Sequence, residues 1–265
     1  MFVDGSLKKK INLGSINSIN WTRIMAQISY YIYAFNKVRD ITGKNNVSFS
    51  VPTGNFGDAY AGFLAKEKLK IPINKIIVAT NSNNILDRFF RTGTYKRGNV
   101  YKTISPSMDI QIASNFERLL YDTNNLDGEL VEDLMDNFRD RNLIKVSKEC
   151  LDYAKKSFTS FSINERNTIQ SIKKIYEDFN IIVDPHTAIG LNAANKFLSK
   201  NKDEIVISLA TAHPAKFSES VYSILGINPE IPDNYQDIFK LNEKYEIIDN
   251  SYEVIRSYII KKSLN

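Results

Sequence analysis

The order of apolar and polar residues divides the first half of the chain into short strands and amphipathic helices. Apolar side chains recur every three or four positions between residues 20 and 35, which predicts a helix with one buried face. Residues 47–51 form a β-prone run that ends at a proline. Proline has no amide hydrogen to donate to a neighbouring strand, so the interior of a strand does not tolerate it. A helix is expected over 58–68, with Asp58 as its N-cap, and a buried strand over 75–79.

The pattern changes after one more helix, expected over 84–90. Residues 108–179 carry mostly helical periodicity separated by polar turns, and 204–210 return to a strand. Residues 235–264 predict one or two peripheral elements. Strands that alternate with helices favour an α/β fold, in which a parallel sheet is joined by helical crossovers. No internal repeat or low-complexity linker marks a domain boundary.

Composition limits the class of protein, its expected location and its expected partners. The 265 residues are 43% hydrophobic and 25% charged, as in globular proteins, and no run approaches the roughly 20 apolar residues that cross a bilayer. No signal peptide is recognisable, and the single Cys150 excludes an internal disulfide, so a cytoplasmic location is expected. The net charge of +5 is spread among nearly as many acids, which disfavours nucleic acid as a partner. Two histidines argue against a metal site.

Three polar loops follow predicted strands, at residues 52–58, 80–84 and 211–213. Ligands bind beyond the carboxyl ends of strands in open parallel sheets, so these loops are expected to wall a site. In the first loop Gly54 and Gly57 let a ligand approach the main chain, and the helix that follows adds the positive end of its dipole. This pattern indicates phosphate binding without a lysine, although a plain tight turn fits it at least as well. Asp58 brings a negative charge and must point away from a phosphate.

Six segments occur in the order found in threonine synthases, and we identify the chain as similar to that family. The fullest are SVPTGNFGD at 50–58, DPHTA at 184–188 and ATAHPAKF at 210–217. The others lie at 17–23, at 79–89, and at 105–110 with 114–118.

The resemblance implies an incomplete α/β fold: a three-layer sandwich with a mostly parallel sheet, like the β subunit of tryptophan synthase and other pyridoxal-phosphate enzymes of fold type II. Residues 1–265 would form the carboxy-terminal part of such an enzyme. The large catalytic-domain portion would occupy about 40–225, and peripheral elements 226–265. The implied reaction converts O-phospho-L-homoserine and water to L-threonine and phosphate, the last step of threonine biosynthesis. A threonine-synthase-like phospholyase and a non-catalytic phosphate- or pyridoxal-phosphate-binding protein remain as alternatives, as does an α/β interaction domain whose loop is only a turn.

The resemblance also assigns residues. Main-chain amides of four loop residues would hold the phosphate of pyridoxal 5'-phosphate: Gly54, Asn55, Phe56 and Gly57. The hydroxyl of Thr211 would bind the pyridine nitrogen. Five residues are candidates for substrate binding: Asn81, Ser107, Asp109, Asn115 and Arg118. A surface position explains Arg118 equally well, and Asn84 replaces the acid that is typical of the family. A structural role is expected for His186, and a helix cap or surface charge for His213 and Lys216.

In the family, a Schiff-base lysine follows an amino-terminal segment resembling Gly-Pro-Thr and lies in Phe-Lys-Asp. The chain contains no such segment, and Lys66, Lys68 and Lys75 stand in other contexts. We therefore expect this chain to supply no catalytic residue and to be inactive alone. Met1 resembles an internal methionine of a longer protein, and the expected partner is the amino-terminal half of the same enzyme. Without it, exposed sheet edges and apolar helix faces should make the chain prone to association.

Overall fold

The computed structural model describes residues 4–14 and 16–263, which fall into two compact units. Residues 18–230 form the larger unit, and residues 1–17 with 231–265 form the smaller one. None of the helices in the described ranges is long and apolar enough to traverse a lipid bilayer. The predicted catalytic-domain limits of 40–225 stay a prediction.

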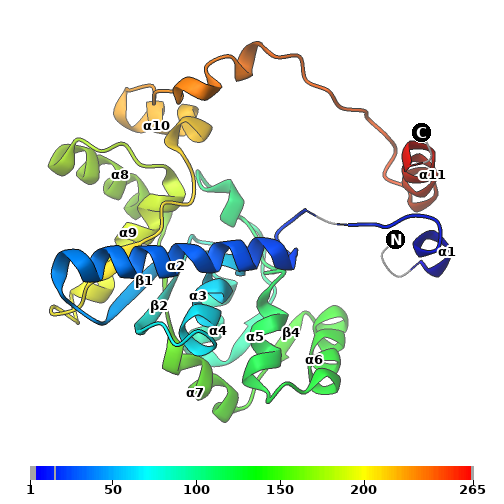
Figure 1. Ribbon diagram of the computed structural model, residues 1–265, viewed down its shortest axis with the longest axis horizontal. Coiled ribbons are helices and arrows are strands. Elements are labelled where there is room, and N and C mark those ends of the chain that lie inside the picture. The colour runs from blue at the N-terminus through cyan, green and yellow to red at the C-terminus, as the bar shows by residue number, and fades with distance from the viewer. Residues whose placement is uncertain (1–3, 15, 264–265) are drawn as a thin grey trace. The chain divides into compact units, whose positions relative to one another are not determined.

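A four-stranded parallel sheet organises the larger unit (Figure 1). The strand order is β5-β2-β1-β6, with these bounds: β1 Val47–Pro52, β2 Ile73–Thr80, β5 Phe158–Ser162 and β6 Val206–Ser208. Every residue of β1 is buried, since it lies between two neighbours and below helices on both faces. The predicted strands at 47–51 and 75–79 are confirmed, and the strand predicted at 204–210 is shorter than expected.

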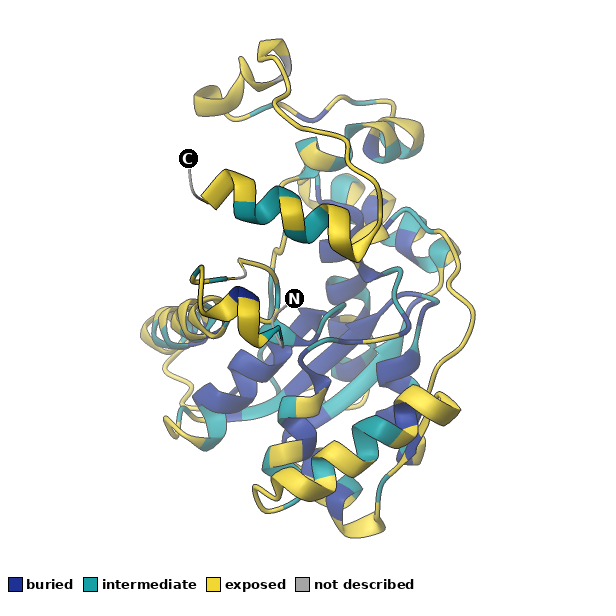
Figure 2. Cartoon of the chain, turned by 90° about the vertical axis from the view of Figure 1, so that its right-hand side faces the viewer, coloured by how far each residue is buried: buried dark blue, intermediate teal, exposed yellow. Residues whose placement is uncertain are grey.

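Alternate side chains of β2 enter two different cores. Ile76 and Val78 pack in the cluster that includes residues of α3 (Gly57–Glu67) and α4 (Ile85–Thr92). Ile77 and Ala79 pack with residues of α9 (Pro185–Leu198). The sheet is therefore covered on both sides, and the expected three-layer α/β sandwich is confirmed. Figure 2 shows the central strands coloured as buried, whereas the exposed colour lies on helices and loops.

Several elements complete the larger unit. The long helix α2 (Trp21–Thr42) packs on α3 and ends at Gly43 in the left-handed conformation. The remaining helices are α5 Phe116–Thr123, α6 Gly128–Arg141, α7 Lys148–Ser157, α8 Glu165–Phe179 and α10 Ser218–Leu225. Two short strands, β3 Thr94–Lys96 and β4 Leu143–Lys145, pair antiparallel. The region expected to be mostly helical thus also contains β4 and the sheet strand β5.

Among its described residues, the smaller unit has two α-helices, α1 (Gly5–Lys8) and α11 (Tyr252–Ser263), and two 3-10 turns, Asp233–Tyr235 and Ile238–Lys240. Asp4 accepts hydrogen bonds from the Tyr252 hydroxyl at 2.7 Å and from Arg256 Nε at 2.9 Å. The same carboxylate accepts the amide of Ser6 and caps α1. One acidic side chain therefore joins the two helices.

Candidate functional site

The loop between β1 and α3 forms a cradle for an anion. Thr53 N–H donates to Ala79 O at 2.8 Å, which fixes the start of the loop on β2. Within the described part of the chain, none of the next four amides, of residues 54–57, donates a hydrogen bond. They precede the 11-residue helix α3, whose positive end adds to their partial charges. Open amides at a helix start suit a phosphate group such as that of pyridoxal phosphate.

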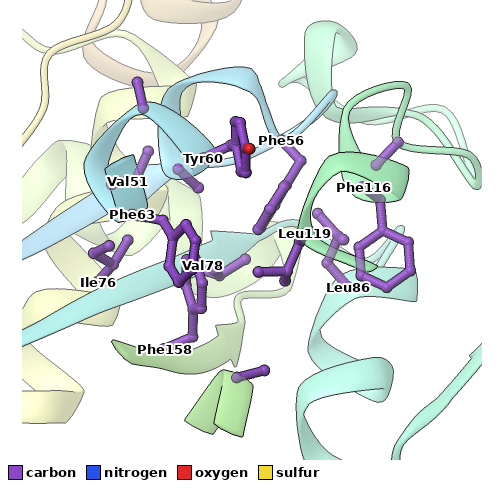
Figure 3. Close-up of a cluster of buried hydrophobic side chains, with 14 of the residues drawn as sticks. Val51, Phe56, Tyr60, Phe63, Ile76, Val78, Leu86, Phe116, Leu119 and Phe158 are labelled. Atoms are coloured by element: carbon purple, nitrogen blue, oxygen red, sulfur yellow. The ribbon is translucent and has the colours of Figure 1, made fainter. Parts of the chain in front are cut away.

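Phe56 gives the cradle its shape. Its φ of 65° lies in the left-handed region, which costs a residue with a Cβ about 1–2 kcal/mol. The ring is 1% exposed and contacts the rings of Phe90, Phe116 and Phe158, with centroids 5.5–6.1 Å apart. Figure 3 shows Phe56 in this cluster, together with Phe116 and Phe158. Burial of such a side chain contributes about 1.5–3 kcal/mol, enough to offset the strain. The aromatic core therefore holds the loop in the conformation that leaves its amides open.

Gly54 allows a second segment to lie directly on the cradle. A Cβ built on Gly54 would come within 2.6 Å of the Ser107 carbonyl oxygen, a distance that no real side chain tolerates. Ser107 lies in a short 3-10 turn, Pro106–Met108. The cradle and this turn therefore fit together because residue 54 has no side chain.

Asp58 does not cap α3 as predicted. Phe56 occupies the cap position without a side-chain bond, and the Tyr31 hydroxyl donates to Asp58 O at 2.8 Å and to Oδ1 at 3.1 Å. Burial raises the pKa of Asp58 from its usual 3.8 to about 6, although the bond from Tyr31 lowers it in part. The Asp58 carboxyl is therefore held by Tyr31, and its negative charge is lost as the pH falls through about 6.

A cavity of about 1150 Å³ opens in front of the cradle. Its walls come from the cradle loop, the face of α2 that carries Tyr30 and Tyr33, and the chain after β6 that carries Thr211. Lys216 also lines it and adds positive charge. Two of the three expected loops, 52–58 and 211–213, thus share one cavity. The loop at 80–84 is not part of the lining formed by the described residues, which corrects that expectation.

Asn81 and Asp109 lie in a closed polar network outside the cavity lining. Asp109 Oδ1 accepts Asn81 Nδ2 at 2.7 Å, Asn83 Nδ2 at 2.9 Å and Thr103 Oγ1 at 2.7 Å. Its other oxygen accepts the Thr103 amide at 2.8 Å. Asn81 and Asn83 are 2% and 3% exposed. These groups satisfy one another, so the structure gives them a scaffold role, and their role toward substrate stays a prediction.

Asn115 and Arg118 are likewise engaged with the protein. Asn115 Nδ2 donates to Ser18 O at 2.8 Å and to Asn55 O at 3.1 Å, which ties the cradle to the start of α2. Arg118 donates to Asn115 Oδ1 and to Ile19 O, and its guanidinium lies over the Trp21 ring. Neither residue belongs to the cavity lining, whereas Ser107 does.

The two histidines, His186 and His213, have structural contacts that the sequence predicted only in part. His186 lies in the first turn of α9, and it also lines the cavity and accepts a hydrogen bond from Ser107 N, a place that the expected structural role did not indicate. His213 caps the turn Pro214–Phe217 by accepting Ala215 N at 3.2 Å. Tyr31, which holds Asp58, was missed because its helical spacing indicates only a core position. In the described ranges no group of three or more His, Cys, Asp or Glu side chains is arranged for a metal ion.

Comparisons with known proteins point to one family. Residues 187–259 match the family model described as "Threonine synthase, C-terminal". A protein named threonine synthase from Pseudomonas aeruginosa is 38% identical over 97% of this chain, and one from Saccharomyces cerevisiae is 39% identical over 98%. A crystal structure described as PLP-bound threonine synthase from Brucella melitensis superposes with a TM-score of 0.88 and 36% identity over 99% of the chain.

These matches cover nearly all of this chain but only about half of each relative. The chain aligns with 54% of the Pseudomonas sequence, 55% of the yeast sequence and 56% of the Brucella structure. It therefore spans about half the length of the relatives it matches.

Proposed function

Because the chain belongs to the threonine synthase family and corresponds to its carboxy-terminal portion, we propose that it supplies the phosphate-binding part of a pyridoxal 5'-phosphate-dependent threonine synthase. The reaction proposed for the whole enzyme converts O-phospho-L-homoserine and water to L-threonine and phosphate. The observation that carries the proposal is the set of open amides at residues 54–57, at the start of α3 and at the wall of the cavity.

Two walls of the cavity carry residues that suit two parts of the cofactor: the cradle loop suits its phosphate, and the chain after β6 suits its ring. The amides of Gly54, Asn55, Phe56 and Gly57 would bind the phosphate oxygens. Thr211 is exposed on the chain after β6 and would donate to, or accept from, the pyridine nitrogen. When bound, the cofactor supplies an electron-withdrawing ring next to the reacting carbon atoms. A neutral hydroxyl partner keeps the ring nitrogen less protonated than a carboxylate would, which moderates that withdrawal.

We propose further that catalysis needs a lysine from the amino-terminal half of the enzyme. No lysine of this chain lies in a sequence that resembles the family's lysine segment. Lys66 donates to the carbonyls of Asn74 and Lys156, and Lys75 donates to that of Lys156. Among the described lysines only Lys216 lines the cavity. This proposal makes the amino-terminal half a partner and O-phospho-L-homoserine the substrate.

The test is an assay of phosphate release from O-phospho-L-homoserine. The chain alone, with pyridoxal 5'-phosphate, should release none, and addition of the amino-terminal half of the yeast threonine synthase should produce threonine and phosphate in equal amounts. The Gly54→Ala chain, whose new Cβ would meet the Ser107 carbonyl, should fail in the mixture, whereas the matched control Gly128→Ala should be active. Release by the chain alone would overturn the need for a partner. Ammonia instead of threonine would identify the phospholyase alternative, and absence of both binding and activity would refute the proposed function.

A further inference from the structure

A buried histidine–aspartate pair stands behind the cavity, at the start of α9. Asp184 is 0% exposed and His186 is 3% exposed. Asp184 Oδ1 lies 2.8 Å from His186 Nδ1, and the carboxylate also accepts the amides of residues 186 and 187 and the Thr187 hydroxyl. Burial raises the pKa of Asp184, but the bonds from His186 and Thr187 outweigh it and hold the pKa below its usual value. An ionised acceptor at Nδ1 fixes the ring with its proton on Nδ1.

The other ring nitrogen faces a segment far away in the sequence. His186 Nε2 accepts the backbone N–H of Ser107 at 3.3 Å. A ring protonated on Nδ1 has its free lone pair on Nε2, so the bonds to Asp184 and Ser107 require the same tautomer. The His186 ring also contacts the Phe217 ring, with centroids 4.7 Å apart. Phe217 lies in the segment after β6 that also contains Thr211, so this segment packs against the histidine ring.

The bond to His186 decides where the Ser107 hydroxyl lies. The Ser107 carbonyl rests on Gly54, and the Ser107 amide donates to His186, so the two peptide groups on either side of the Ser107 Cα are both held. The Ser107 side chain is exposed, lines the cavity and has no hydrogen-bond partner in the described ranges. Ser107, held at both peptide groups, thus has an open hydroxyl and lines the same cavity as the four open amides.

We infer that His186 is a positioning residue: through the Ser107 amide it places the Ser107 hydroxyl as a further donor to a phosphate monoester bound in the cradle. The inference rests on the proposed function, because it takes the phosphate of pyridoxal 5'-phosphate as the ligand. Asp184 contributes by holding the tautomer, and His186 itself does not touch the phosphate.

A series at one position separates positioning from packing. In His186→Gln the amide oxygen reaches the place of Nε2 and can accept the Ser107 amide. In His186→Asn the shorter side chain can donate to Asp184 but does not reach Ser107. His186→Leu makes neither bond. We expect His186→Gln to bind pyridoxal 5'-phosphate within about twofold of the native chain. His186→Asn and His186→Leu should each bind about tenfold more weakly, as for the loss of one bond to a charged group.

A double-mutant cycle tests whether His186 acts through Ser107. Ser107→Ala should weaken binding about tenfold, and the double variant with His186→Leu should be no weaker than either single variant. The measurement is equilibrium dialysis of pyridoxal 5'-phosphate and of inorganic phosphate with the full chain, after circular dichroism and thermal unfolding have shown that each variant is folded.

The outcomes distinguish the two proposals. If the native chain binds neither ligand, the proposed function fails at its cofactor site, and the inference falls with it. If the native chain binds but Ser107→Ala or His186→Leu binds equally well, only the inference fails. Additive losses in the double variant, or no rescue by His186→Gln, would show that His186 acts by packing. Should His186→Leu not fold, Ser107→Ala and His186→Gln still decide, since Ser107 is exposed and glutamine keeps the bond to the Ser107 amide.

Discussion

Two loops that end neighbouring parallel strands look alike in sequence and differ in what their polar groups do. The cradle loop, 52–58, follows β1, and the loop at 80–84 follows β2. Both are polar, and the sequence alone predicted both as walls of a site. The cradle leaves four amides without an acceptor in the described chain, whereas Asn81 and Asn83 direct their side chains onto Asp109. A polar motif therefore forms a binding site only where the fold leaves its groups open.

The loop at 80–84, whose Asn81 and Asn83 side chains are hydrogen-bonded within the protein, supports the cradle loop at 52–58. Asp109 follows the turn Pro106–Met108 directly, and its bonds to Asn81, Asn83 and Thr103 fix that stretch of chain against the end of β2. The same turn rests on Gly54 and carries the Ser107 hydroxyl. The network on one strand thus supports the binding loop on the next.

The largest expected effect comes from closing the open loop. In Gly54→Ala the new Cβ would meet the Ser107 carbonyl oxygen at 2.6 Å, so the cradle or the turn must shift. Loss of two bonds to a charged phosphate at about 1.5 kcal/mol each weakens pyridoxal 5'-phosphate binding about 100-fold. Overpacking should lower the free energy of unfolding by about 1–3 kcal/mol. Isothermal titration calorimetry and urea unfolding measure the two effects.

Gly128→Ala is the matched control for this change. No atom lies within 4 Å of a Cβ built on Gly128, at the start of α6. Ligand affinity should be unchanged in this variant. Equal affinities of Gly54→Ala and the native chain would contradict the cradle.

Opening the closed network should cost stability and leave binding almost intact. Asp109→Asn keeps the shape but replaces one acceptor oxygen by an amide, so donors of Asn81, Asn83 or Thr103 lose their partner. Loss of one such bond in a buried network lowers the free energy of unfolding by about 1–3 kcal/mol. Urea unfolding tests this, with the exposed Asp152→Asn as control. A large loss of affinity for O-phospho-L-homoserine in the reconstituted enzyme, with stability unchanged, would instead support a substrate role for Asp109.

Charge at the open loop is expected to have an effect of similar size at high pH, and this effect fades as the pH falls. The pKa of Asp58 is raised in the fold to about 6 from 3.8, so the folded protein holds this proton more tightly than the unfolded chain. The resulting stability is fully present below pH 4 and is lost as the pH rises through 6. Asp58→Asn should therefore gain up to about 3 kcal/mol relative to the native chain at pH 8, and little at pH 4. Thermal unfolding at the two pH values measures it, and an equal difference at both would contradict the raised pKa.

The sequence predicted the first strands and helices of the sandwich better than the strand β5 in the middle of the chain. Hydrophobic periodicity located β1, β2, α3 and α4 because their buried runs are continuous. It missed β5, where Phe158 and Phe161 are three residues apart and imitate one face of a helix. In the sheet these two side chains point to opposite faces and enter different cores.

For the site, the sequence located the cradle and Thr211 but could not show which groups stay open. Asn81 and Asp109 are as polar as Ser107, and only the fold shows that the first two bind each other while the third faces the cavity. Asp58 looked like a helix cap because acids are common there, but Tyr31 holds its carboxylate instead. Such pairings depend on contacts between distant segments, and local patterns do not encode them.

The smallest expected effect separates the two walls of the cavity. Thr211 lies on the wall formed by the chain after β6, and the phosphate amides lie in the cradle loop. A neutral hydrogen bond contributes about 0.5–1.5 kcal/mol, so Thr211→Val should weaken pyridoxal 5'-phosphate binding about three- to tenfold. Binding of inorganic phosphate should not change, since phosphate alone does not reach this wall. Thr211→Ser keeps the hydroxyl and should restore the native affinity. Equal losses for both ligands would mean that Thr211 shapes the cradle, whereas no loss for either would leave the ring nitrogen to a group outside this chain.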